Sequence, residues 1–136
     1  MSFFDIFKKG FFPERHEKEL EAVKIENNFE KLVYIARNSS FSDVRIEAIK
    51  KISDEDVLVD IAYNDSNREV RKAAIKKISD EDVLVDIASN DSNSEVRKEA
   101  IKKISRVHVL DSIYRKDSNR NVRETAKNRL EELNWE

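Results

Sequence analysis

The residues best suited to chemistry in this 136-residue chain are two histidines and a series of turn carboxylates. His16 and His108 are far apart in the sequence, and no group of His, Asp and Glu has the spacing of a metal site. The chain has no cysteine, which excludes disulfides, thiolate zinc sites and cysteine nucleophiles. We therefore expect no catalytic residue, no bound metal and no cofactor, and hence a protein that is not an enzyme.

The alternating carboxylates and amides of one turn have the spacing of the first ligands of a calcium loop. In such a loop, Asp65, Asn67 and Glu69 would be followed by Gly at the sixth position and by a bidentate Glu at the twelfth. Val70 and Lys76 occupy those two positions. The pattern predicts helix capping rather than calcium binding.

Arginine and aspartate recur at a fixed interval of 26 residues. On a helical wheel, Arg71 falls about 100° from Val70 and inside the apolar arc, so its guanidinium should be mostly covered. A covered guanidinium needs an acceptor, and we predict a ladder of Arg–Asp pairs, with ligand binding by these arginines as the alternative. The ladder comprises Arg45, Arg71, Arg97, Arg123, Asp65, Asp91 and Asp117.

A second set of cations is predicted on the exposed arc of the same helices. The neighbouring helices expose Asp56 and Asp60, so acidic and basic residues are sorted onto different surfaces. A basic stripe of this kind would attract an acidic protein partner. The alternative is a solvated surface of intrahelical pairs such as Glu69 with Lys72. The candidate partner-binding residues are Lys50, Lys72, Lys76, Lys98 and Lys102.

These side chains are positioned by an internal repeat. Segments 54–79 and 80–105 differ at three positions only, and 28–53 and 106–131 keep the same apolar pattern. Apolar residues at helical spacing occur twice per repeat, which predicts two short helices in each. One such hairpin cannot bury its apolar stripe alone, so the repeats must stack into an all-α solenoid of antiparallel helix pairs. The four repeats, numbered 1 to 4, are 28–53, 54–79, 80–105 and 106–131.

The helix ends are predicted without glycine, which occurs once in the chain. Serine should cap the helix starts at Ser53, Ser66, Ser79 and Ser92, because an acidic residue follows each of them three positions later. Asn64 and Asn90 should end the first helices in the left-handed conformation that asparagine tolerates.

The repeat resembles a known family. The run Asp65-Ser66-Asn67-x-Glu69-Val70-Arg71-Lys72-x-Ala74-Ile75 is similar to the HEAT-like repeats of the phycobilisome-lyase type, and its period approaches that of the leucine-rich repeat variant. The resemblance covers residues 28–131 and implies an α-solenoid whose second helices line the concave face. The deoxyhypusine hydroxylases, which are HEAT-repeat enzymes, hold di-iron with repeated His-Glu pairs. This chain has one such pair, His16-Glu17, in the segment before the repeats.

The segments outside the repeats are predicted to protect the ends of the array. Residues 14–27 resemble the second helix of a degenerate repeat and should form an N-terminal capping helix. Residues 132–136, with Leu133 and Trp135, should form a C-terminal cap. Residues 1–13 are rich in Phe and should fold back as a hydrophobic arm. The alternative for residues 1–12 is an anchor that docks on a partner or on a membrane surface.

We therefore predict a cytoplasmic, monomeric, non-enzymatic scaffold or adaptor for protein–protein interaction. The chain is 40% charged with a formal net charge of −2, and it has no apolar run long enough to span a membrane. Two alternatives remain. One is an accessory role in cofactor attachment, which only the family resemblance suggests. The other is nucleic-acid binding through repeat 4, which carries seven Lys or Arg and four Asp or Glu.

Overall fold

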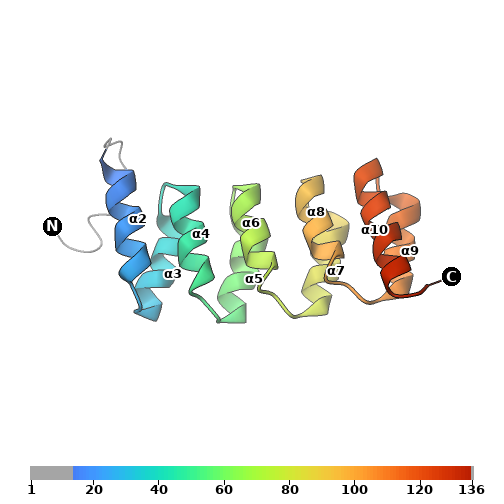
Figure 1. The fold of residues 1–136 in the computed structure, drawn as a ribbon, viewed down its shortest axis with the longest axis horizontal. Helices are drawn as coiled ribbons and strands as arrows, with labels where there is room; N and C mark the ends of the chain where they lie inside the picture. Colours follow the sequence, from blue (N-terminus) through green and yellow to red (C-terminus); the bar gives the residue numbers. More distant parts are fainter. Residues whose placement is uncertain (1–13, 136) are drawn as a thin grey trace. The chain divides into compact units, whose positions relative to one another are not determined.

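The computed structural model describes residues 14–135, and all regular structure in that range is α-helical (Figure 1). The hydrophobic arm predicted for residues 1–13 and the final Glu136 lie outside the described residues. The nine described helices are α2 (Arg15–Ile25), α3 (Phe29–Asn38), α4 (Ser42–Lys50), α5 (Glu55–Asn64), α6 (Arg68–Ile75), α7 (Glu81–Asn90), α8 (Ser94–Ile101), α9 (Val107–Lys116) and α10 (Arg120–Glu132).

The helices form two compact units, one up to Lys77 and one from Ile78 onward. In the N-terminal unit, α3 pairs with α4 and α5 with α6, while α2 packs on α4 and α4 on α6. In the C-terminal unit, α7 pairs with α8, α9 pairs with α10, and α8 packs on α10. The all-α class is therefore confirmed, and consecutive helices pack as neighbouring pairs, as in a helical repeat protein. Because α3 and α5 touch only slightly, the main contact between successive pairs within a unit runs through the second helices, α4 with α6 and α8 with α10.

The core of each pair uses the same few positions. In repeat 2 the first helix buries Leu58, Ile61 and Ala62, and the second buries Val70, Ala74 and Ile75. Helices of 8 to 13 residues are marginal in isolation, so packing on the neighbouring helices must stabilise them. Burial of each large aliphatic side chain contributes roughly 1.5–3 kcal/mol, which makes this layer the main source of stability.

The prediction that serine caps the helices is wrong by one residue. Asn67, not Ser66, is the N-cap of α6, and its Oδ1 accepts hydrogen bonds from the amides of Glu69 (2.8 Å) and Val70 (3.3 Å). Asp65 Oδ1 accepts from the Asn67 amide at 2.9 Å, which closes the turn and leaves Ser66 exposed at its tip. The corresponding caps elsewhere are Asp54, Asp80 and Asn93 in place of Ser53, Ser79 and Ser92.

The prediction of left-handed asparagines at the ends of the first helices is also wrong. Asn64 and Asn90 are the last residues of α5 and α7, and each side chain donates to an Asp four residues earlier at 2.8 Å. The chain then leaves the helix in an extended conformation, which any residue can adopt, with φ −65° at Asp65. Among residues 14–135, Asn134 has a positive φ, 57°.

The two ends of the array differ from its middle. At the N-terminal end, α2 lies within the segment predicted as a capping helix and buries Val23. At the other end, α10 stops at Glu132, and the amides of Asn134 and Trp135 bond back to Glu131 and Leu130, which is the pattern of a left-handed helix terminus. The Trp135 ring packs edge-on against His108, with centroids 5.7 Å apart. In the described part of the chain, no helix is both long and apolar enough to cross a bilayer.

Candidate functional site

Two of the predicted ladder arginines bind an aspartate of the next repeat. Arg45 donates from Nε and Nη2 to the carboxylate of Asp65, at 2.9 and 3.1 Å. Arg97 makes the same two bonds to Asp117, at 2.9 and 3.0 Å. These side chains are about one-tenth exposed, so each bidentate pair is largely removed from water. The pairs join α4 to the turn after α5, and α8 to the turn after α9.

The third guanidinium nitrogen holds the turn of the arginine's own repeat. Nη1 of Arg97 donates to the Asp91 carbonyl oxygen at 2.9 Å, and Nη1 of Arg71 donates to the Asp65 carbonyl oxygen at 2.9 Å. Each ladder arginine therefore fixes one turn within its repeat. Arg71 belongs to the N-terminal unit and Asp91 to the C-terminal unit.

The Asp117 carboxylate is held in its ionised form. Burial by itself would raise the pKa of Asp117, but hydrogen bonds from Arg97 and from the Asn119 amide favour the charged carboxylate. The positive charges of Arg97 and Arg123 act in the same direction. The pKa of Asp117 is therefore lower than the ordinary aspartate value.

The N-terminal end of the ladder has the opposite polarity. Glu19 lies one period before Arg45, and Ser39 lies one period before Asp65. The Ser39 hydroxyl donates to Glu19 Oε2 at 2.5 Å, and Arg15 Nε donates to Glu19 Oε1 at 2.7 Å. A carboxylate thus occupies the arginine position and a hydroxyl the aspartate position. Helix α2 therefore keeps a polar contact with the repeat that follows it, but makes this contact with different chemical groups.

Sequence reasoning missed a second column of cations, which binds helix ends. Lys51 Nζ donates to the carbonyls of Val23 (3.0 Å), Lys24 (2.6 Å) and Glu26 (2.9 Å), at the end of α2. One period later, Lys77 Nζ donates to the carbonyls that end α4, those of Ile49 (3.0 Å), Lys50 (2.9 Å) and Ile52 (2.5 Å).

The same contact continues in the C-terminal unit. Lys103 donates to the Ile78 carbonyl, and Arg129 Nε donates to the Ile104 carbonyl at 2.9 Å. A cation at a helix C-terminus satisfies exposed carbonyls and complements the helix dipole. Burial lowers the pKa of Lys77. The 26-residue recurrence of these cations was the sequence signal for this contact. It was hidden because each of these lysines stands beside a second, exposed lysine in a Lys-Lys pair.

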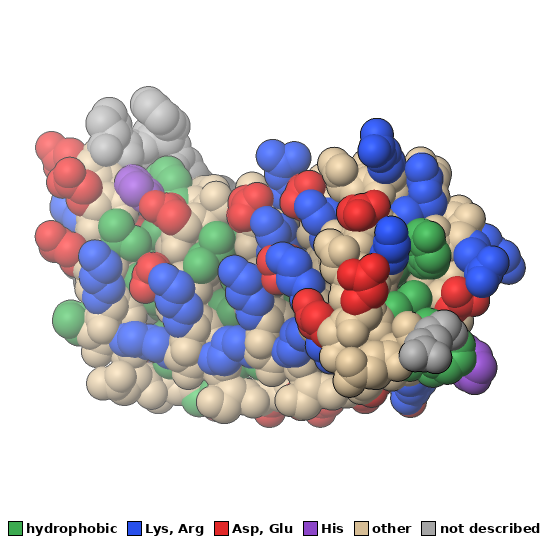
Figure 2. All heavy atoms as spheres, turned by 45° about the vertical axis from the view of Figure 1, so that its right-hand side comes forward, with side chains coloured by type: hydrophobic (Ala, Val, Ile, Leu, Met, Phe, Trp, Pro, Cys, Tyr) green, Lys and Arg blue, Asp and Glu red, His purple; other side chains and the backbone are tan. Residues whose placement is uncertain are grey.

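Three of the predicted partner-binding lysines line a groove between α4 and α6. The groove encloses about 420 Å³. Its lining contains one carboxylate, Glu69, and the apolar side chains of Ile46, Ile49 and Ala73. Figure 2 shows Lys and Arg side chains gathered over the face that this unit presents in that view. The four lysines of the lining are Lys50, Lys72, Lys76 and Lys77.

Most of the candidate lysines also have a carboxylate on their own helix. Lys50 lies 2.8 Å from Glu47, and Lys72 lies 3.6 Å from Glu69. In the C-terminal unit, Lys98 and Lys102 lie 3.5 and 3.4 Å from Glu95 and Glu99. These i,i+3 pairs are the intrahelical pairs that the sequence offered as the alternative to a basic binding stripe. They reduce the positive field of α8. In the groove between α4 and α6, lysines outnumber the carboxylate.

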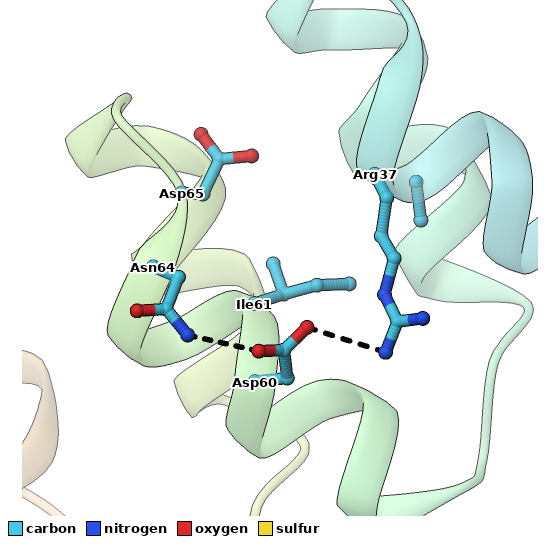
Figure 3. A pocket seen from close by; sticks show the side chains of 6 residues that line it. Arg37, Asp60, Ile61, Asn64 and Asp65 are labelled. Carbon is cyan, nitrogen blue, oxygen red and sulfur yellow. Dashed lines mark hydrogen bonds and ion pairs between the residues drawn. The ribbon is translucent and has the colours of Figure 1, made fainter.

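A second, smaller hollow lies between α3 and α5, where the first helices separate. It encloses about 220 Å³ and is lined by Ala36, Arg37, Asp60, Ile61, Asn64 and Asp65. Arg37 Nη2 lies 3.2 Å from Asp60 Oδ2, and Asn64 donates to the other oxygen of the same carboxylate (Figure 3). Both carboxylate oxygens of Asp60 therefore have a partner within the protein.

Several basic residues of repeat 4 are engaged inside the chain. Arg106 Nη1 lies 2.6 Å from Asp82, and Arg115 Nε lies 2.9 Å from Asp111. Arg129 binds the end of α8 and Glu132. These contacts leave fewer cations for phosphate groups than the composition of repeat 4 suggests.

The two histidines lie in different units. His16 Nε2 lies 2.6 Å from Asp43 Oδ2, and its ring packs on Phe41 with centroids 4.7 Å apart. His108 contacts Trp135. Residues 14–135 contain no group of three or more His, Asp and Glu side chains arranged to hold a metal ion.

No protein-family model, curated protein or solved structure matches this chain. The fold is therefore described from the helix pairs, and the candidate site from its distances and contacts. The HEAT-like resemblance rests on the repeat residues alone.

Proposed function

We propose that the chain is a HEAT-like, non-enzymatic scaffold or adaptor that binds an acidic partner protein on the face formed by its second helices. The groove between α4 and α6 carries this proposal, because Lys50, Lys72 and Lys76 line it with one carboxylate around apolar side chains. An acidic segment seated there would gain charge complementarity from the rim and apolar contact from Ile46 and Ala73.

The use of the other recurring polar groups supports a binding role. The ladder arginines and the helix-end cations bind turns, carboxylates and carbonyls of the chain itself. They therefore stabilise the stack of repeats. Lys50, Lys72, Lys98 and Lys102 have long, partly exposed side chains in i,i+3 pairs, which are weak and can exchange for a partner's carboxylates.

Affinity capture from the native host tests this proposal with charge-reversed variants. Lys72→Glu/Lys98→Glu should lose acidic partner proteins that the wild-type chain retains. The matched control, Arg115→Glu/Lys116→Glu, reverses two charges on α9, away from the second helices, and should retain the same proteins. If both variants capture the same proteins as the wild type, the second-helix face is not the binding surface.

Nucleic-acid binding through repeat 4 is the weaker candidate. Arg106, Arg115 and Arg129 already contact acidic residues, and the chain carries a net charge of −2. A titration with duplex and single-stranded oligonucleotides at low salt distinguishes the two functions, because phosphate binding would weaken steeply as salt is added.

A further inference from the structure

The last repeat departs from the others at positions that are buried in the repeat before it. Ala88 of α7 and Ile101 of α8 are fully buried. One period later, the corresponding residues are Tyr114, which is 37% exposed, and Lys127, which is exposed. An aromatic ring and a charge thus replace two small or apolar contact residues. These two positions of repeat 4 therefore lack the small and apolar side chains that are buried in repeat 3.

Arg123, the ladder arginine of repeat 4, makes only part of the contacts that Arg97 makes. Arg97 uses Nε and Nη2 for the Asp117 carboxylate and Nη1 for a turn carbonyl. Arg123 keeps the carbonyl bond, from Nη1 to the Asp117 oxygen at 2.8 Å. Within residues 14–135 no carboxylate meets its Nε or Nη2, and neither atom is among the buried groups that lack a partner. Both nitrogens therefore reach solvent, while Nη1 makes the same turn contact as Nη1 of Arg97.

Two more cations lie on the same face of α10. Arg120 and Lys127 are three residues before and four residues after Arg123, which places all three side chains along one stripe. Both are exposed, and neither forms an ion pair with another described residue. Tyr114 lies three residues before Asp117, whose carbonyl holds Arg123. We call Tyr114, Arg120, Arg123 and Lys127 the end cluster.

We propose that the end cluster binds an acidic peptide segment of another protein, with one carboxylate on Arg123 in the geometry that Asp117 adopts on Arg97. Arg120 and Lys127 would bind flanking carboxylates, and the Tyr114 ring would cover the aliphatic part of the segment. This site is separate from the groove between α4 and α6, so either can fail without the other.

Other occupants fit less well. A second copy of this chain would have to present Ser39 at the position of the acceptor aspartate, and that hydroxyl already donates to Glu19. Phosphate groups of a nucleic acid would draw on the remaining cations of the repeat, but Arg106 and Arg115 are paired with aspartates. A carboxylate, by contrast, already occupies the equivalent site in the same chain.

The test is an NMR titration of the full chain with a capped octa-aspartate peptide, with the arginine Nε–Hε signals and the backbone amides as readout. The Arg123 signal and the amides of α10 should shift and saturate together. Lys127→Glu should weaken this site by about fivefold or more, because it replaces an attractive charge by a repulsive one. Arg115→Gln removes a charge from the same repeat outside the end cluster and should change the affinity less than about twofold.

Three outcomes would overturn the proposal. The Arg123 signal could stay unmoved at saturating peptide, or Arg115→Gln could weaken binding as much as Lys127→Glu does. A 12-nucleotide single strand could also shift the same signals at lower concentration than the peptide, which would make the end cluster a phosphate site. Lys127 is exposed, so its variant should keep the wild-type helical circular dichroism spectrum and report on binding rather than on folding.

Discussion

At the scale of single residues, the contribution of an ion pair between repeats depends on how far its two side chains are removed from water. Arg45 binds the turn of its own repeat through Nη1 and the Asp65 carboxylate of the next through Nε and Nη2. Arg37, in the same unit, pairs with Asp60 at 3.2 Å, but both side chains are nearly half exposed. The two ion pairs therefore differ mainly in desolvation, and they form a natural comparison.

Asp65→Asn should lower the free energy of unfolding by about 2 kcal/mol, because it removes the charge that Arg45 requires and leaves a covered guanidinium poorly paired. Asp60→Asn is the matched control and should cost less than about 1 kcal/mol, since the pair that it weakens is solvated. Urea unfolding of both variants measures the difference. Equal losses would mean that the covered pair contributes no more than the exposed one.

Acid should weaken the same contacts. Because folding lowers the pKa of Asp117, the folded chain holds that proton less tightly than the unfolded chain does. The resulting stability is present above the unfolded aspartate value of 3.8 and is lost as the pH falls through the lower folded pKa. Asp117→Asn should thus be less stable than wild type at pH 6, and the gap should narrow at pH 3. A gap that stays constant between these pH values would exclude this linkage.

At the scale of helices, the sequence predicted the number and spacing of the helices well and their ends less well. The 26-residue period and the apolar positions correctly indicated two short helices per repeat. The caps were displaced by one residue because both Ser66 and Asn67 can accept amide hydrogen bonds. The choice between Ser66 and Asn67 depends on the turn that Asp65 closes. The capping pattern of the sequence does not reveal this turn.

The binding of helix ends could not be predicted from single helices, because it joins residues about 25 positions apart. Lys50 and Lys51 look equivalent in the sequence, yet Lys50 pairs with Glu47 on its own helix and Lys51 binds the last carbonyls of α2. The direction in which each lysine points follows from the packing of α4 on α2. A recurring charge at the repeat period is thus better evidence for contact between repeats than its local surroundings suggest.

Lys77→Met should destabilise the N-terminal unit by about 1–2 kcal/mol, because three carbonyls at the end of α4 lose their donor. Lys77→Arg should recover most of that loss, since Arg129 performs the equivalent role in repeat 4. Lys50→Met, at an exposed neighbouring position, is the control and should change stability by less than about 0.5 kcal/mol. Thermal unfolding of the three variants measures these stability changes. Equal effects of Lys77→Met and Lys50→Met would contradict a stabilising contact between Lys77 and the end of α4.

At the scale of the whole molecule, the chain separates the groups that stabilise it from the groups available to a partner. Arg45, Arg97 and the helix-end cations, Lys77 among them, bind groups of their own unit. Lys50, Lys72 and Lys76 of the groove between α4 and α6, and the end cluster, remain accessible. The sequence indicated the basic stripe of lysines but not the groove. The groove depends on how α4 and α6 pack and on which lysines bind helix ends.

Insertion of an additional copy of residues 80–105 after residue 105 should give a folded chain with a higher midpoint of thermal unfolding. Each added repeat contributes its own stability and one more interface with its neighbour. The same insertion with alanine at the position of Arg97 should gain less, because its bidentate contact is missing. Circular dichroism melts of the three chains provide the comparison, and an insertion that lowers the midpoint would argue against additive stacking.

The location of partner binding is the central claim, and site-resolved NMR of the full chain tests it most directly. On titration with a capped octa-aspartate peptide, the amides of α4 and α6 around Lys50, Lys72 and Lys76 should shift together. Lys72→Glu should abolish these shifts, whereas Lys127→Glu should leave them unchanged. Shifts that avoid α4 and α6, or that persist undiminished in Lys72→Glu, would contradict the proposed binding surface.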